Sequence, residues 1–138
     1  MNSLVVIMFI AVICIGIALL VIISLTRRGG SLLDQEKYRS QWLAITQSVT
    51  QDEGSKQFAV ISADKLLDQA MREVGVTGES MGERLKNAKS RFRNNDSVWR
   101  AHKLRNRIAH EGNITISNQQ TQGALGSFKQ ALTDLGAL

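Results

Sequence analysis

The stretch KQFAVISADKLLDQAMREV, residues 56–74, decides the fold. Its apolar side chains recur every three to four residues and therefore gather on one wide face of a helix, with Lys65, Asp68 and Arg72 outside it. The residues on this face are Ala59, Val60, Ala63, Leu66, Leu67, Ala70, Met71 and Val74. Because so broad an apolar face has to be covered on several sides, we predict that this segment is the central core helix.

Helical periodicity continues on both sides of the core helix. We expect further helices over residues 33–50, 81–92 and 98–110, and a last helix that opens after Ser117. The chain contains no proline, and alternating strand patterns are scarce. The sequence therefore predicts an all-α domain, a bundle of four or five helices over residues 31–138.

Several polar residues and one glycine mark the expected helix ends. Ser80 and Asp96 are candidate N-caps for the helices that follow them, and Ser117 with Gln120 forms a capping-box pattern. Gly75 is expected to end the core helix.

An apolar run without charged side chains covers residues 4–25. A helix of this length rises about 33 Å, which is enough for the hydrocarbon core of a bilayer. We expect a single transmembrane helix, so that residues 1–30 form an anchor and a short basic, glycine-containing linker. The alternative is a cleaved signal peptide, which would need a basic leader, a shorter apolar core and a small-residue cleavage pattern.

The charges around the apolar run predict an orientation. Arg27 and Arg28 follow the run directly, whereas residues 1–3 carry no charged side chain. The positive-inside tendency places the N-terminus outside the cell membrane and residues 31–138 in the cytoplasm. Cys14, the single cysteine, lies within the run, so the predicted bundle has no thiol, as suits a reducing compartment.

Charge is distributed unevenly along the 138 residues, whose net charge is +5. Residues 31–83 carry five basic and nine acidic side chains, whereas residues 84–107 carry nine basic side chains and one acidic one. A polyanion is the expected partner, either RNA or anionic lipid head groups, and a solvated basic face is the plainer interpretation. The candidate RNA-binding residues are Arg84, Lys86, Lys89, Arg91, Arg93, Arg100, Lys103 and Arg107.

The predicted helix over residues 98–110 carries the side chains best suited to chemistry. Arg105 falls within its apolar stripe, and a guanidinium in such a place needs a carboxylate, a partner subunit or a phosphate. His102, Asn106 and His110 follow one another at intervals of four residues, so they form a polar ridge along the edge of the stripe.

The six residues from Arg105 to His110, RNRIAH, resemble the motif of the HEPN superfamily, an arginine and a histidine separated by four residues. The order of the expected helices over residues 33–138 is also similar to a compact HEPN domain. The resemblance implies a metal-independent endoribonuclease in which Arg105 holds the scissile phosphate, His110 acts as acid or base, and Asn106 orients either group. It also implies a homodimer, because the motif commonly lies at a dimer interface.

A non-catalytic interpretation stays open beside this one. Arg105 can instead close a buried ion pair with Asp64 or Asp68 of the core helix, and His110 is favourable as a cation at a helix C-terminus. His102 is then a packing or hydrogen-bonding residue. In that case the domain is a membrane-tethered module that binds a protein partner or an antitoxin.

Other kinds of site find little support. Two histidines without paired cysteines or a carboxylate cluster predict no metal site, and no nucleotide fingerprint suggests a cofactor. A helix-turn-helix that reads DNA is a third hypothesis, but a membrane anchor makes chromosome reading awkward.

Overall fold

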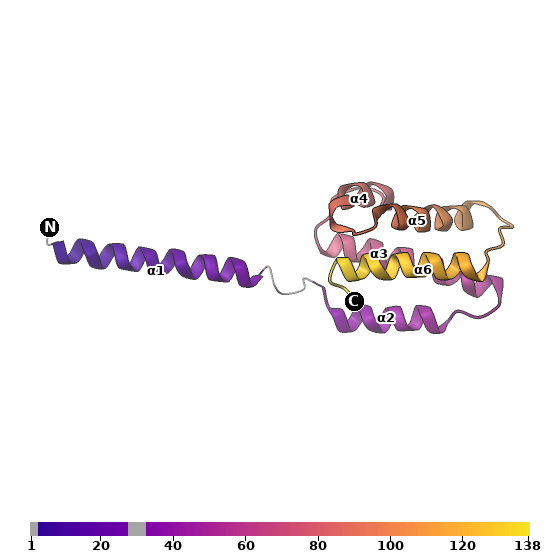
Figure 1. The fold of residues 1–138 in the computed structure, drawn as a ribbon, viewed down its shortest axis with the longest axis horizontal. Helices are drawn as coiled ribbons and strands as arrows, with labels where there is room; N and C mark the ends of the chain where they lie inside the picture. The colour runs from indigo at the N-terminus through magenta and orange to yellow at the C-terminus, as the bar shows by residue number, and fades with distance from the viewer. Residues whose placement is uncertain (1–2, 28–32) are drawn as a thin grey trace. The chain divides into compact units, whose positions relative to one another are not determined.

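The computed structural model describes residues 3–27 and 33–138, which belong to two separate units (Figure 1). The first unit holds α1 (Ser3–Arg27). The second holds α2 (Gln35–Gln47), α3 (Glu53–Glu73), α4 (Met81–Asn87), the 3₁₀ helix η1 (Lys89–Arg91), α5 (Asn95–His110) and α6 (Asn118–Asp134). Every regular element among the described residues is helical, which confirms the all-α prediction.

Helix α1 is apolar on all sides, and its described side chains, from Ser3 to Ile22, are exposed. This stretch of 20 residues has a mean hydropathy of 3.4, so its length and composition are sufficient to cross a membrane. A signal sequence near the N-terminus has the same properties. Arg28 and the linker of two glycines lie outside the described residues, as does the side chain of Arg27.

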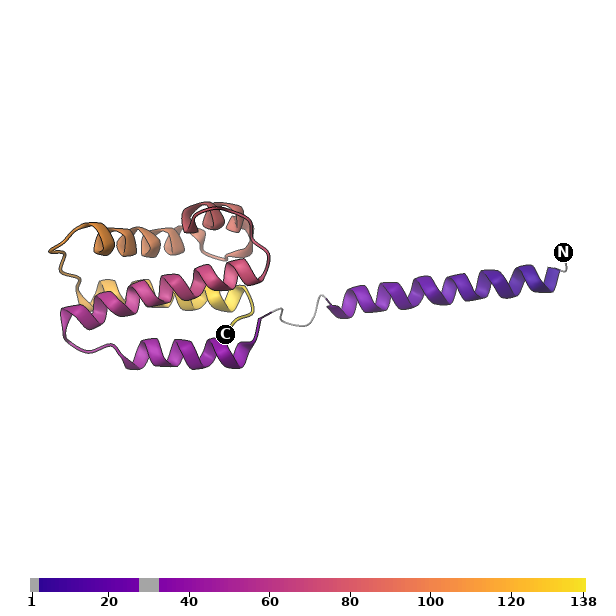
Figure 2. The same cartoon turned by 180° about the vertical axis from the view of Figure 1, so that it is seen from behind.

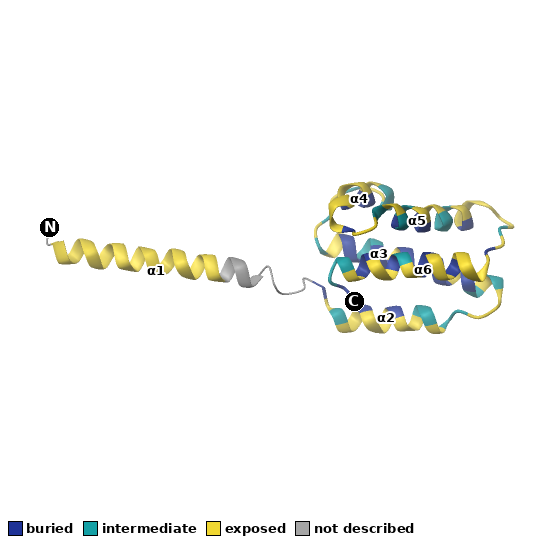
Figure 3. Cartoon of the chain, in the orientation of Figure 1, coloured by how far each residue is buried: buried dark blue, intermediate teal, exposed yellow. Residues whose placement is uncertain are grey.

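Helix α3 is the centre of the second unit, as the sequence predicts. It packs against α2, α5 and α6, and α5 also packs against α6. In two opposite views, α3 and α6 lie between α2 and α5, and α4 is seen nearly end-on (Figures 1 and 2). Figure 3 shows the buried positions on the sides of these helices that face one another. The largest fully buried side chains are Tyr38, Phe128, Leu67, Met71, Leu85, Ile116, Leu132, Val60, Val98 and Thr121.

Two helices begin earlier than predicted because the capping residue lies further upstream. The side chain of Asp52 accepts a hydrogen bond from the backbone N–H of Ser55 at 3.1 Å, so α3 starts at Glu53. The side chain of Asn94 accepts from Ser97 N–H at 3.1 Å. The prediction that Asp96 caps this helix is therefore wrong. Asp96 lies in the first turn of α5, where its carboxylate still favours the helix N-terminus.

The predicted helix over residues 81–92 is interrupted. Ser80 caps it as expected, accepting from Glu83 N–H at 3.2 Å, but α4 ends at Asn87 and the chain tightens into η1. Phe92 follows in extended conformation and is buried. The break in the helix thus brings an aromatic side chain into the core.

The helix predicted over residues 33–50 is shorter in the structure, since α2 spans Gln35–Gln47, whereas the predicted start of α6 and end of α3 are confirmed. Ser117 and Gln120 form the capping box of α6, with hydrogen bonds of 3.1 and 2.9 Å. Gly75 follows α3 with a φ of 79°, a conformation that favours glycine. Its N–H donates to the carbonyl of Arg72 and the next N–H donates to the carbonyl of Met71, so these two carbonyls near the end of α3 are satisfied.

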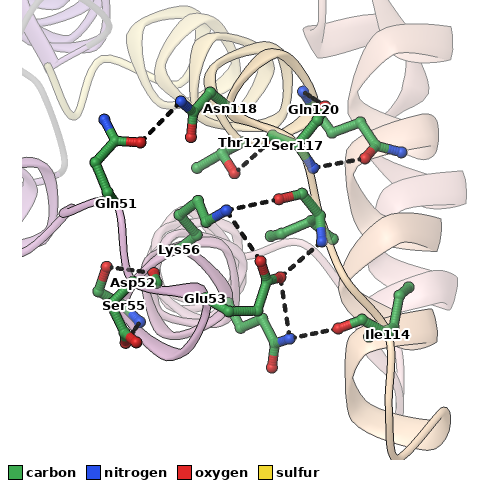
Figure 4. Close-up of polar contacts among 12 residues, drawn as sticks. Gln51, Asp52, Glu53, Ser55, Lys56, Ile114, Ser117, Asn118, Gln120 and Thr121 are labelled. Carbon is green, nitrogen blue, oxygen red and sulfur yellow. Dashed lines mark hydrogen bonds and ion pairs between the residues drawn. The ribbon is translucent and has the colours of Figure 1, made fainter.

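The loop between α5 and α6 is held by three side chains from the first turns of α3, Glu53, Lys56 and Gln57, which we call the loop anchor (Figure 4). Glu53 accepts the N–H of Ile116 at 2.6 Å, and Lys56 donates to the carbonyl of the same residue at 2.9 Å. Gln57 donates to the carbonyl of Ile114 at 2.7 Å. The hydrogen bond from Ile116, together with Lys56, holds the pKa of Glu53 below its usual value. The loop anchor thus fixes the chain just after the end of α5.

Candidate functional site

Four polar side chains meet where α5 packs on α3. Asp64 comes from the buried face of α3, and His102, Arg105 and Asn106 come from α5. We call these four residues the Asp64 cluster. His102 and Asn106 are neighbours because they are four residues apart on the helix, and Arg105 adjoins Asn106 in sequence.

The side chains of the Asp64 cluster form a closed ring of contacts. One carboxylate oxygen of Asp64 lies 2.8 Å from Nδ1 of His102, and the other lies 3.4 Å from Nε of Arg105. Nε2 of His102 lies 3.2 Å from Nδ2 of Asn106. Nη1 of Arg105 donates to Oδ1 of Asn106 at 3.0 Å. Each side chain therefore contacts two others.

The chemistry of the donors fixes the direction of these hydrogen bonds. Arg105 can only donate, so the amide oxygen of Asn106 faces it and the amide nitrogen faces His102. Nε2 of His102 then accepts, and Nδ1 carries the proton that it donates to Asp64. Both ring nitrogens of His102 are thus occupied. Its side chain is 8% exposed, so the imidazole is largely shielded from solvent.

Trp99 lies against the imidazole of His102. The two rings meet edge to face, with centroids 5.9 Å apart and an interplanar angle of 77°. This arrangement is favourable between aromatic rings and adds packing to the polar contacts of the imidazole. The sequence interpretation of His102 as a packing and hydrogen-bonding residue agrees with this environment.

Arg105 is held by the cluster but reaches its surface. Its side chain is 34% exposed, whereas that of Asp64 is 5% exposed. Nε makes the ion pair with Asp64 without a well-directed hydrogen bond, and Nη1 bonds to Asn106. Nη2 has no partner among the residues that the structure describes. The guanidinium is therefore fixed on one side and open on the other.

His110 is the last residue of α5 and is exposed. It lies one turn beyond Asn106 on the same side of the helix. Its imidazole makes no hydrogen bond or ion pair with any residue in the described parts of the chain, so it stands outside the Asp64 cluster. An unoccupied imidazole near neutrality can take or give a proton.

Arg84 does not fit the predicted RNA-binding set. Its side chain is 5% exposed, and its Nε donates to Asp68 of α3 at 2.6 Å. A further hydrogen bond joins it to the carbonyl of Gly78. Because its charge is paired with a carboxylate and its side chain is buried, Arg84 is not available to bind RNA.

Arg93 is exposed but paired, since its Nε lies 2.7 Å from Asp134. Burial alone raises the pKa of Asp134, but hydrogen bonds from the backbone and side chain of Arg93 and from Gln130 outweigh it and lower that pKa. The other members of the predicted set are all exposed. They are Lys86, Lys89 and Arg91 near α4, and Arg100, Lys103 and Arg107 on α5.

A groove of about 560 Å³ lies between α5 and α6. Its α5 wall contains three of these exposed cations, Arg100, Lys103 and Arg107. The other lining residues are small, polar or aliphatic: Ser97, Ala101, Leu104, Gln120, Gly123, Ala124 and Ser127. The groove and the Asp64 cluster therefore lie on opposite flanks of α5.

No family model matches this chain, and neither a curated protein nor a solved structure matches it. The site therefore has to be interpreted from its own geometry. Within the described residues, no group of three or more histidine, cysteine, aspartate or glutamate side chains is placed to hold a metal ion.

Sequence reasoning underestimated His102 and missed the loop anchor. The sequence does contain a signal for His102. Asp64 lies between Val60 and Leu67 on the apolar face of the core helix, and a buried carboxylate needs hydrogen-bond donors such as an imidazole. No comparable signal exists for the loop anchor. Its partners are backbone groups about 60 residues away, which no side-chain pattern reveals.

Proposed function

We propose that this chain is a membrane-anchored, HEPN-like endoribonuclease that needs no metal and acts as a dimer. The observation that carries the proposal is the state of Arg105. Its guanidinium is held in place by Asp64 and Asn106 while one terminal nitrogen stays open at the surface. A fixed cation of this kind is suited to a phosphate, because little reorganisation is needed when charge develops on it.

Cleavage of RNA needs one proton acceptor and one proton donor. The 2′-hydroxyl loses its proton and attacks the adjacent phosphorus, the bond to the 5′-oxygen breaks, and that oxygen takes up a proton. A cyclic 2′,3′-phosphate and a 5′-hydroxyl result. His110 is the exposed imidazole on the same helix as Arg105, so it is suited to one of these proton transfers.

A dimer would supply the second exposed imidazole that one protomer lacks. Each chain offers one exposed imidazole, His110, because both nitrogens of His102 are occupied within the Asp64 cluster. Two copies that bring their α5 helices together would provide one imidazole as base and one as acid. Anchoring two chains in the same membrane favours such pairing by raising their local concentration.

The test is cleavage of a mixed RNA pool by the full chain in a neutral detergent, with a chelator present. We expect cyclic-phosphate ends with the parent protein and loss of cleavage in Arg105→Ala and His110→Ala. Arg39→Ala, which also removes an exposed cation but lies outside the predicted RNA-binding set, is the matched control and should cleave normally. A folded, dimeric parent protein that leaves the RNA intact would refute the enzyme.

The second candidate is a non-catalytic, membrane-tethered module that binds a protein partner. The observation in its favour is that the Asp64 cluster is closed and largely buried, so Arg105 has a sufficient structural role within it. Under this hypothesis the RNA assay is negative for every variant, whereas Arg105→Ala still lowers stability.

We also propose that α1 is retained as the anchor, with the N-terminus outside and the helical domain in the cytoplasm at the cell membrane. The support comes from the length and composition of α1 and from the arginines that follow its apolar part in the sequence. A cytoplasmic domain would meet RNA, as the ribonuclease hypothesis requires.

A further inference from the structure

The cations of the α5–α6 groove form a row that leads to His110. Arg100, Lys103, Arg107 and His110 follow at intervals of three, four and three residues, and all four are exposed. On an α-helix this spacing keeps them within an arc of about 80° and over a length of about 15 Å. The row therefore connects the groove to the one exposed imidazole of α5.

The floor and the opposite wall of the groove differ from the charged row. Leu104 and Ala101 are apolar, and α6 contributes Gln120 and Ser127 with two small residues between them. One of these is Gly123, where an added side-chain carbon would meet nothing within 4 Å. The groove thus offers positive charge along one edge, an apolar floor, and amide and hydroxyl groups along the other edge.

We propose that this groove binds a single strand of RNA, with backbone phosphates on Arg100, Lys103 and Arg107. The strand would then reach His110 at the end of the row, a step that rests on the proposed ribonuclease function. Proteins bind unpaired strands by combining a row of cations with surfaces that accept exposed bases. The apolar floor and the polar edge fit bases, whereas a flat layer of lipid head groups would contact only the cations.

Glu111 competes with the RNA for one of these cations. Nε of Arg107 lies 3.3 Å from its carboxylate, and both side chains are about half exposed. An RNA phosphate at Arg107 has to replace this ion pair. Arg100 and Lys103 form no ion pair with a described residue, so they are the freer phosphate ligands.

The experiment measures binding apart from cleavage. The full chain in neutral detergent is titrated into a fluorescent 2′-O-methyl oligonucleotide, which lacks the nucleophilic hydroxyl, and the affinity is followed as salt is varied. We expect Arg100→Gln combined with Lys103→Gln to weaken binding at least tenfold at low salt. Loss of two phosphate contacts should lower the salt slope by about 1.4. Glu111→Gln should strengthen binding, because it frees Arg107.

The matched control is Arg39→Gln combined with Lys65→Gln, which removes two exposed charges from α2 and α3, outside the groove and outside the predicted RNA-binding set. An equal loss of affinity and slope in this control would overturn the proposal, since binding would then follow net charge alone. Absence of oligonucleotide binding by the parent protein would also overturn it. Binding only to phosphatidylserine vesicles would assign the cations to lipid instead.

The two proposals fail in different ways. A protein without ribonuclease activity can still bind the oligonucleotide through the groove. Conversely, cleavage that is lost in His110→Ala but unchanged in the groove variant would support the enzyme and refute the groove.

Discussion

At the scale of single residues, the carboxylate of Asp64 serves two partners at once, so its removal should cost more than the removal of Arg105. We expect Asp64→Ala to lower the free energy of unfolding by about 3–5 kcal/mol, because His102 and Arg105 both lose their buried acceptor. Arg105→Ala should cost about 1–2 kcal/mol, because Arg105 is one-third exposed and Asp64 keeps its bond to His102. Urea unfolding followed by circular dichroism measures both.

His110→Ala is the control for this pair. Its side chain is exposed and outside the Asp64 cluster, so the free energy of unfolding should change by less than about 0.5 kcal/mol. An Arg105→Ala variant as unstable as Asp64→Ala would contradict the ring of contacts described above.

For an ion pair within the chain, the sequence offered Asp64 and Asp68 as carboxylate partners of Arg105 but could not choose between them. Asp64 and Asp68 are four residues apart, so they lie on the same side of the core helix. The choice depends on which cation of another helix arrives beside each one. Arg84 of α4 pairs with Asp68, whereas His102 and Arg105 of α5 pair with Asp64. Such an assignment follows from tertiary packing and not from spacing within one helix.

At the scale of elements, the loop anchor makes the joint between α5 and α6 sensitive to acid. The pKa of Glu53 is below its usual value of 4.5, chiefly because its carboxylate accepts the N–H of Ile116. A carboxylate with a lowered pKa contributes stability above its unfolded pKa, and this contribution is lost as the pH falls through the folded pKa. We therefore expect the loop anchor to weaken below about pH 4.5.

The measurement compares the parent protein with Glu53→Gln between pH 7 and pH 3. The difference in unfolding free energy should be largest near pH 7 and shrink on acidification, because glutamine has no charge to lose. Glu73 and Asp134, whose pKa values are also lowered, titrate in both proteins and cancel in the difference. A difference that stays constant over this range would show that the charge of Glu53 contributes nothing.

A helix cap acts within its own segment, and two of these caps were predicted. The capping box of α6 and the cap of α4 depend on residues three apart in sequence, and both were found in advance. The break after α4 was not, because the pattern over residues 81–92 is continuously helical. Beyond the break Phe92 is extended and buried in the core, a tertiary contact that the pattern of a single segment does not reveal.

At the scale of the whole molecule, the main question is whether α1 stays with the helical domain. We expect the mass of the protein recovered from membranes to include α1. The proposed orientation, with the domain in the cytoplasm, predicts that a C-terminal alkaline phosphatase fusion is inactive. Moving the positive charges of Arg27 and Arg28 to positions 2 and 3 should reverse the orientation and activate the fusion. Recovery of a chain that has lost its apolar segment would instead identify α1 as a signal sequence.

The central place of α3 also has a consequence for how the chain folds during synthesis. The face of α3 that carries Leu67 and Met71 leaves the ribosome well before α6, yet α6 is one of the helices that cover it. Until residues 118–134 have been made, this apolar face lacks part of its cover. A nascent chain already anchored through α1 would wait at the membrane in that state, within reach of chaperones and proteases. The cover of α3 is therefore complete only after α6, the last helix of the domain, has been made.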